Sequence, residues 1–491
     1  MKKPNIARLF LYRHRFGIGY TVLGIIFLAI IILMPFLAPS GLSAAEIESV
    51  KASDSLHLAA MTSGDLVDVP YHTLQKISIS LLGLTPFAIK LPSIIIAILL
   101  GLLLILLLNR WFKNNVALLS SIITVLSTPF LYLAGSGTPL IMLVFWPTLL
   151  LWLGSKIQGE KKPKPKYCLL FALALLLSIF TPYMVYFAIF IVLFAFLNPH
   201  LRFTIKSLPK IPLVLTAIVI LAGLTILALS FINHPDTVAT LTFTKTPGNF
   251  WDNLKTGITP FFIAIPDQTP YLSPLFGLAV STLAIIGLVS TVHGFFASRN
   301  AIASCFIIFA LILSGINPNA AFILILSIAI LVAHGLRYTL EKWYGLFPEN
   351  PYARILGLIP IVIFLGLIIV SDVIHYVYGY RYSPTVAPEF STDLQLIRDN
   401  LLDKNATLLT TDDEYNFYKL LAGPSEEKTD TVSVNNLVIT KNQPETPSTL
   451  ALTRAAKSKL PEGCNLTKII TNSKSADSNR LYLYICKNST K

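Results

Sequence analysis

The sequence predicts an α-helical polytopic membrane protein with about eleven transmembrane helices and a small external α/β domain at its C-terminus. The 491 residues are 54% hydrophobic and only 13% charged, whereas about a quarter of the residues of an average soluble domain are charged. The apolar residues form long runs up to about residue 382, after which charged residues return. Lipid must therefore be the main solvent of the first part, and water that of the second.

The long apolar runs give the individual spans, because a transmembrane helix needs about 20 mostly apolar residues. We expect spans near 17–37, 88–108, 116–134, 139–154, 168–181, 183–197, 212–233, 273–292, 301–315, 318–336 and 355–377. The two runs between 168 and 197 are short, and only Thr181, Pro182 and Tyr183 separate them. They form either a hairpin that crosses twice or one long kinked helix.

The loop charges favour the hairpin. Basic residues occur in the N-terminus, at 155–167 and 198–211, and as Arg299, Arg337, Lys342 and Arg354. They all fall on one side of the membrane only if 168–197 crosses twice, and the positive-inside rule makes that side cytoplasmic. The transmembrane part, residues 1–382, then has extracytoplasmic loops at 38–87 and 234–272. Residues 383–491 form an extracytoplasmic domain, and the first span acts as a signal anchor in the plasma membrane.

The net charge of +13 does not indicate nucleic-acid binding. The basic residues lie mostly in short loops, where they orient a membrane protein and make no continuous phosphate-binding face. The sequence also has no zinc-type Cys/His spacing, no Walker loop and no GxGxxG after a strand. We therefore expect membrane lipids as partners and no nucleic acid.

The C-terminal segment alternates helical and strand patterns. We expect helices at 391–402, 414–423 and 447–460, and strands at 406–412, 433–440, 466–473 and 480–487. Cys464 and Cys486 lie on or beside neighbouring strands of this domain. Outside the cytoplasm an even pair of thiols usually forms a disulfide, although two unpaired thiols are the alternative.

The loop at 38–87 is much longer than a turn requires, and long loops often carry function. It begins with Ala45-Glu46 and continues with Pro70-Tyr71-His72, Leu82-Gly83-Leu84 and Lys90-Leu91-Pro92-Ser93. This succession resembles the start of the GT-C membrane glycosyltransferases of the protein O-mannosyltransferase and aminoarabinose-transferase type. The acidic motifs diverge from the family, because its first acid is Ala45 here. The place of its second acid reads Gly135-Ser136-Gly137-Thr138-Pro139.

The resemblance implies transfer of a hexosyl or pentosyl group from a polyprenyl-phosphate sugar. The acceptor would be a lipid, glycan or protein of the cell envelope, at the outer membrane face. Glu46 matches a catalytic acid and is the expected base for the acceptor, with a solvated loop acid as the alternative. Lys90 matches a family Arg and either contacts the donor phosphate or snorkels. Tyr71 and His72 either line the same cavity or anchor the loop at the interface.

Five further residues are candidates for substrate binding. Asp372 and His375 lie three residues apart near the outer end of the last span, so they share a helix face, and Arg381 follows at the surface. Trp251 and Asp252 lie in the second long loop. The alternatives are snorkelling for the first group and an ordinary interfacial helix for the second. No cofactor is certain, and a need for a divalent metal stays open.

Two other functions compete with sugar transfer. A non-catalytic GT-C relative would bind a lipid-linked sugar or a partner protein, and the divergent acidic motifs favour it. A transporter is less favoured, because the spans contain few ionisable residues and no matching pair of broken helices.

Overall fold

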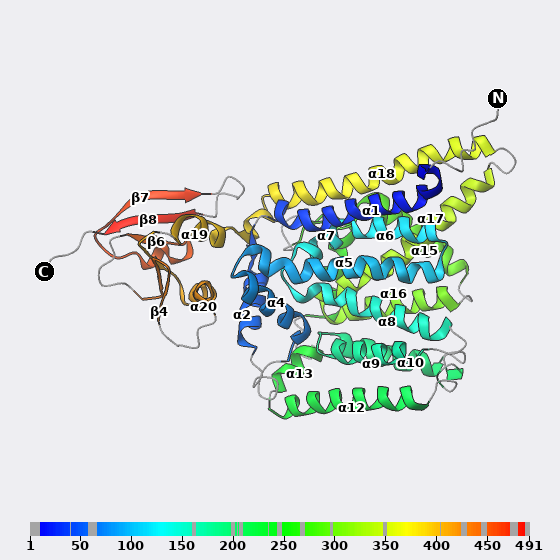
Figure 1. The fold of residues 1–491 in the computed structure, drawn as a ribbon, viewed down its shortest axis with the longest axis horizontal. Helices are drawn as coiled ribbons and strands as arrows, with labels where there is room; N and C mark the ends of the chain where they lie inside the picture. Colours follow the sequence, from blue (N-terminus) through cyan, green and yellow to red (C-terminus); the bar gives the residue numbers. More distant parts are fainter. Residues whose placement is uncertain are drawn as a thin grey trace.

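The computed structural model describes most of the chain (Figure 1). The described residues are 10–39, 41–56, 66–159, 164–197, 202–203, 205, 210–233, 235–242, 248–265, 271–294, 298–346, 351–402, 404–423, 430–442, 449–471 and 480–486. Of the basic residues predicted to hold the N-terminus in the cytoplasm, Lys2, Lys3 and Arg8 lie outside the described residues, whereas Arg13 and Arg15 lie in the described helix α1 (Phe10–Leu37).

The first part of the chain is a bundle of long apolar helices that run side by side (Figure 1). A helix lies in each predicted run. The run 116–134 holds the bent pair α6 and α7, the runs 139–154 and 318–336 each begin with a short 3₁₀ helix, and the run 273–292 begins five residues before its helix. The helices are α1 (Phe10–Leu37), α5 (Pro86–Trp111), α6 (Asn114–Val125), α7 (Thr128–Gly135), α8 (Met142–Gly159), α9 (Pro165–Ile179), α10 (Met184–Leu197), α12 (Lys210–Asn233), α15 (Leu278–His293), α16 (Ser298–Ile316), α17 (Leu324–Leu346) and α18 (Pro351–Tyr382). The predicted fold class of a polytopic membrane protein is thereby confirmed.

Burial separates a central helix from a peripheral one. In the apolar window of α17, 94% of the residues are buried inside the protein, against 22% in that of α18. Helix α17 packs closely on α15, since a Cβ atom added at Gly287 would lie 1.9 Å from the Leu331 carbonyl oxygen. Small residues allow such close helix packing in membranes. Helix α18 therefore presents most of its surface to lipid.

Helices α9 and α10 form a hairpin. The turn between them contains Tyr183, which has a positive φ of 66°. The Asp68 amide donates to the Phe180 carbonyl at 2.8 Å, and the Tyr183 amide donates to the Leu241 carbonyl at 3.2 Å. The turn thus lies beside the first long loop, at the bundle end that carries the C-terminal domain. We call this end the domain side.

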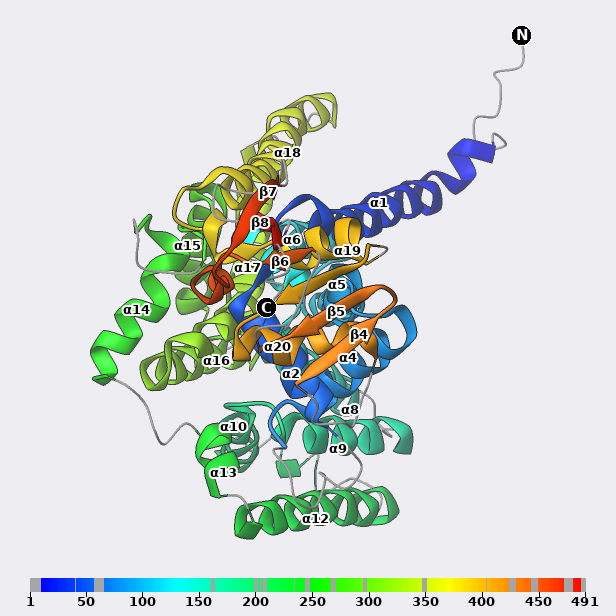
Figure 2. The ribbon, with the colours of Figure 1, turned by 90° about the vertical axis from the view of Figure 1, so that its left-hand side faces the viewer.

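Shorter elements cover the domain side of the bundle. The first loop contains β1 (Leu42–Ser43), α2 (Ala44–Ser55) and α4 (Val69–Leu82), and the second contains α13 (Pro235–Thr242) and α14 (Phe250–Phe262). The 3₁₀ helices η2 (Pro139–Ile141) and η3 (Pro318–Ile323) begin the chain's return into the bundle. Figure 2 looks onto this side and shows α14 at the edge of the bundle, apart from α2 and α4.

The C-terminal domain is a six-stranded mixed sheet in the order β4-β5-β3-β6-β8-β7. Strand β3 pairs in parallel with β5 and with β6, and the other pairings in this sheet are antiparallel. The elements are η4 (Ala387–Glu389), β2 (Phe390–Ser391), α19 (Asp393–Leu401), β3 (Ala406–Leu409), α20 (Asp412–Tyr418), η5 (Lys419–Ala422), β4 (Thr431–Val434), β5 (Leu437–Thr440), β6 (Leu450–Leu452), η6 (Ala455–Lys459), β7 (Cys464–Thr471) and β8 (Arg480–Cys486).

Two of the predicted elements in this domain are wrong. The expected helix at 447–460 is instead strand β6 followed by η6, because Leu450, Ala451 and Leu452 are fully buried between β3 and β8. The expected single strand at 433–440 is a hairpin of β4 and β5. Asn435 turns the chain with a φ of 51°, a left-handed conformation that Asn tolerates well.

The C-terminal domain packs directly on the first loop. Strand β1 pairs antiparallel with β2, with Leu42 opposite Ser391. One apolar cluster contains Val50 of α2, Ile89 of α5 and Ile397 of α19. Gly41 is required at this contact, because a Cβ atom there would lie 2.5 Å from the Ser391 carbonyl oxygen. The domain and the loop therefore share a core.

Cys464 and Cys486 form the expected disulfide. They begin β7 and end β8 as directly paired residues, so the disulfide closes the hairpin at its open end.

Asp393, in the first turn of α19, makes the stability of the domain depend on pH. The pKa of Asp393 is raised from 3.8 to about 6, mainly because the group is buried. A hydrogen bond to Ser391 lowers the pKa, and the charge of Glu414 contributes to raising it. A raised carboxyl pKa favours the folded state most below about pH 4, where the group is protonated in both states. Stability is then lost as the pH rises to about 6, and we expect the free energy of unfolding to fall by about 2 to 3 kcal/mol.

Urea titrations of full-length protein at about pH 4 and pH 7, followed by near-ultraviolet circular dichroism, measure this loss. Asp393→Asn should abolish most of it; an unchanged loss in that variant would contradict the assignment.

Candidate active site

Glu46 lies in the first turn of α2 and closes a capping box with Ser43. The Ser43 amide donates to Glu46 Oε2 at 2.7 Å, and the Glu46 amide donates to Ser43 Oγ at 3.3 Å. A Ser at the N-cap followed by Glu three residues later satisfies two backbone donors that a helix start leaves open. The local sequence therefore accounts for the position of Glu46, whose exposed fraction is only 1%.

The second oxygen of Glu46 reaches the bundle. The Gly137 amide donates to Glu46 Oε1 at 2.7 Å, and Lys90 Nζ lies 3.9 Å from the same atom. Lys90 is 3% exposed and also donates to the carbonyls of Pro39 at 3.2 Å and Gly41 at 3.0 Å. Glu46 and Lys90 thus form a buried pair that joins the loop to α5 and to the segment before η2.

Gln75 of α4 extends this buried network. Its Nε2 donates to the Gly137 carbonyl at 2.9 Å and to the Ile89 carbonyl at 3.3 Å. Its Oε1 accepts from Ser49 Oγ at 2.8 Å. Because buried polar groups are costly unless they are hydrogen-bonded, this network fixes α2, α4 and α5 relative to one another.

A second group of buried ionisable residues lies next to this network, around Asp68. Asp68, Tyr71 and His72 are 6%, 0% and 6% exposed. Burial raises the pKa of Tyr71 above its usual range, and the Tyr71 hydroxyl lies 2.7 Å from Ser93 Oγ. The Tyr71 and His72 rings meet edge to face, with centroids 5.9 Å apart. Tyr71 and His72 therefore lie together inside the protein, which does not fit exposed anchors at the membrane interface.

Asp68 also has an unusual backbone conformation. Its φ is 54°, and its side chain does not cap α4, although it occupies the N-cap position. Tyr183 on the α9–α10 turn has a positive φ as well and is 2% exposed. Its pKa is raised first by burial and then by the charge of Asp68. Such conformations cost about 1–3 kcal/mol in non-glycine residues and cluster at functional sites.

Asp372 and His375 brace the second loop against α18. Asp372 is 3% exposed, and its Oδ1 comes so close to Gly277 that an added Cβ there would lie 2.5 Å away. His375 Nε2 lies 3.1 Å from the Pro274 carbonyl oxygen. The burial of Asp372 excludes the snorkelling alternative for this residue. The side chain instead lies at Gly277, the N-cap residue just before α15.

Arg381, Trp251 and Asp252 lie on the surface and do not join the buried groups. Arg381 contacts the Tyr382 ring with its guanidinium carbon 5.4 Å from the centroid. Trp251 is 74% exposed on α14, an amphipathic helix, and Asp252 beside it is also exposed. An exposed Trp on an amphipathic helix is typical of a membrane interface.

Metal ligands do not converge in the described ranges. Within these residues, three or more His, Cys, Asp or Glu side chains never group closely enough to hold an ion.

Comparison with known proteins decides the fold. A family model described as dolichyl-phosphate-mannose-protein mannosyltransferase matches residues 70–236. The apo structure of ArnT from Cupriavidus metallidurans has a TM-score of 0.56 at 13% identity and covers 96% of this chain and 99% of its own. ArnT bound to undecaprenyl phosphate gives 0.53 at 14% identity, with 96% and 98% covered. The chain has the GT-C fold.

Other comparisons with the GT-C fold are more distant. The apo oligosaccharyltransferase of Archaeoglobus fulgidus gives a TM-score of 0.51 at 14% identity, with 84% of this chain and 61% of that chain covered. A comparison with curated proteins finds no sequence match. The predicted resemblance to GT-C proteins is confirmed at the level of the fold.

The structure shows the surroundings of the two places where the family has an acid and this chain has none. Ala45 is exposed on the first turn of α2, next to the buried Glu46. In the stretch 135–139, which stands in the place of the second acid, a Cβ atom at Gly137 would lie 2.7 Å from the Ile89 side chain and 3.3 Å from Glu46 Oε1, so a larger residue does not fit at Gly137 itself. The Gly137 amide instead binds Glu46.

Asp68, Gln75 and Tyr183 belong to the site but were not among the predicted residues. In the sequence Asp68 is one of several acids in the long loop at 38–87. An Asp two residues before Pro70 predicts the start of a helix. It does not predict that the Asp side chain is buried. Gln75 and Tyr183 carry no local signal, because their partners lie far away in the sequence.

Proposed function

We propose that this GT-C protein is a membrane glycosyltransferase that moves a sugar from a polyprenyl-phosphate donor to an acceptor at the outer membrane face. The observation that carries the proposal is the match of the whole chain to ArnT, one of whose structures binds undecaprenyl phosphate. The domain side is then the extracytoplasmic side, in the plasma membrane. The acceptor is a lipid, glycan or protein of the cell envelope.

Transfer requires a base that takes the proton of the acceptor hydroxyl as the glycosidic bond forms. Glu46 stays a predicted candidate, but both of its oxygens accept from backbone amides, and Lys90 lies beside it. We therefore assign Glu46 and Lys90 to positioning the loop. Asp68 is the proposed base, because it is a buried carboxylate in a strained conformation beside Tyr71, His72 and Tyr183.

The test of this function is turnover by the full-length protein in lipid nanodiscs. Radiolabelled polyprenyl-phosphate sugars serve as donors, with membrane extract as the acceptor, and the same sugars on nucleotide carriers serve as controls. We expect label to move to the acceptor only from the lipid carriers. Transfer from nucleotide sugars alone, or no transfer from any donor, would contradict the proposal.

The second candidate is a non-catalytic GT-C relative that binds a lipid-linked sugar or a partner protein. Exposed Ala45, in the place of an acid, is the observation that favours it. Binding of the labelled lipid without transfer would support this candidate.

A further inference from the structure

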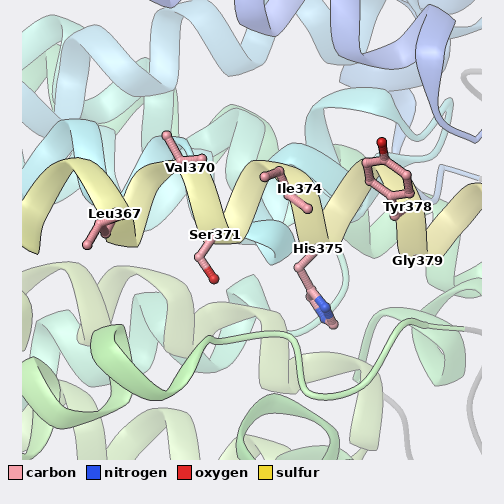
Figure 3. Close-up of a pocket in the computed structure, with 7 residues that line it drawn as sticks. All are labelled: Leu367, Val370, Ser371, Ile374, His375, Tyr378 and Gly379. Atoms are coloured by element: carbon pink, nitrogen blue, oxygen red, sulfur yellow. The ribbon is translucent and has the colours of Figure 1, made fainter.

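Helix α18 carries a groove on its lipid-facing side. The groove has a volume of about 560 Å³ and is open over much of its length. All seven lining residues stand on α18, and Figure 3 shows Ser371 and His375 pointing to one side of the helix and Val370 and Tyr378 to the other. Asp372, which braces the second loop, is buried on α18 and does not line the groove.

The length of the groove matches one leaflet of a bilayer. From Leu367 to Tyr378 the helix rises by about 16 Å, at about 1.5 Å per residue. The hydrocarbon core of a bilayer is about 30 Å thick, so one leaflet contributes about 15 Å. Exposed Ile374 and Tyr378 supply apolar surface along this length. The groove therefore fits one hydrocarbon chain of a lipid in the domain-side leaflet.

Charge at the open end of the groove selects the headgroup. Arg381 follows Leu367 and Ile374 at intervals of seven residues, which places all three on one stripe of a helix. It is exposed at the domain-side end of α18. Asp372 is the only acid within the span from 362 to 382 and is turned inward. An anionic phosphate at the membrane surface thus meets the cation Arg381 and no exposed acid of α18 between 362 and 382; the next exposed acid, Glu389, lies beyond the helix on η4.

We infer that the α18 groove binds one anionic phospholipid of the domain-side leaflet, with a chain along the helix from Leu367 to Tyr378 and its phosphate at Arg381. This site is separate from the buried groups around Glu46 and Asp68, and it does not depend on sugar transfer. His375 links it to the second loop through the Pro274 carbonyl oxygen.

Native mass spectrometry of the full-length protein tests this site. The protein is titrated in detergent with phosphatidylglycerol or phosphatidylcholine of identical chains. We expect one retained phosphatidylglycerol and weaker retention of phosphatidylcholine. Arg381→Gln should weaken phosphatidylglycerol binding about 5-fold, which corresponds to about 1 kcal/mol for one basic residue near the surface. Arg398→Gln, which removes an exposed charge from α19, is the matched control and should change nothing.

A second variant tests the groove itself. Ser371 is exposed, so Ser371→Phe fills the groove without disturbing the core and should abolish the retained lipid. Val362→Phe, at an exposed position of the same helix outside the groove, is its control. Equal retention of both lipids, an effect of neither variant, or a dimer that covers α18 in place of lipid would overturn the inference.

Discussion

Asp68→Asn is expected to lower the rate of sugar transfer by about 10²- to 10⁴-fold, the usual contribution of a general base. Asn has nearly the same shape as Asp and tolerates a positive φ, so the start of α4 should keep its conformation. The amide cannot accept the proton of an acceptor hydroxyl. Initial rates at saturating donor, measured with full-length protein in nanodiscs, give the effect on kcat.

Glu46→Gln is the matched control for this prediction. The Gln oxygen can still accept from the Gly137 amide, while the negative charge is lost. If Glu46 only positions the loop, transfer should fall by less than about tenfold, far below the effect of a lost base. A Glu46→Gln variant that is folded but inactive, together with an active Asp68→Asn, would reverse the two roles.

The membrane part of the fold could be predicted because lipid imposes a simple rule on sequence. A backbone in hydrocarbon must satisfy its own hydrogen bonds, so each long apolar run becomes a helix. Runs such as 88–108 and 355–377 therefore located α5 and α18. The charges of the short loops decided for a hairpin between 168 and 197, where the length of the runs was ambiguous.

The C-terminal domain was predicted less completely, because tertiary contacts override local preference there. Residues 450–452 are followed by a helix-favouring Arg-Ala-Ala-Lys sequence, yet the sheet buries them as a central strand. The Cys464–Cys486 pair could be anticipated because both residues lie near predicted strands. The place of the domain on the first loop could not, since the pairing of β1 with β2 connects residues about 350 positions apart in the chain.

For the site, the sequence identified the right loop but not the role of each residue. Glu46 stands out because it directly follows a span, and the same Ser43-to-Glu46 spacing also forms a capping box. Lys90 similarly stands near a helix end, and a lysine there either snorkels or binds a phosphate. The sequence does not distinguish these two roles. Only the structure shows that both charged groups bind inside the protein. Glu46 accepts from the Gly137 amide, and Lys90 donates to the carbonyls of Pro39 and Gly41.

Lys90→Met should destabilise the protein by about 3 to 5 kcal/mol, the usual cost of removing one partner from a buried ion pair. The Met side chain is of similar length and fills the space, so the loss comes from polar groups. Glu46 would remain buried without its cation, and the carbonyls of Pro39 and Gly41 would lose a donor. Equilibrium unfolding of the full-length protein in a mixed detergent series measures the change.

The exposed pair on α2 provides the control for this experiment. Lys51 Nζ lies 2.8 Å from Glu48 Oε1, and the Glu48 side chain is 71% exposed. Such surface pairs contribute about 0 to 1 kcal/mol, so Lys51→Met should have little effect. In the double variant Lys90→Met/Glu46→Gln neither charge of this pair remains buried, and part of the lost stability should return. If Lys90→Met proved as mild as Lys51→Met, the buried pair would not hold the loop. Glu46 would then regain its place as the candidate base, because its carboxylate could leave Lys90 at little cost.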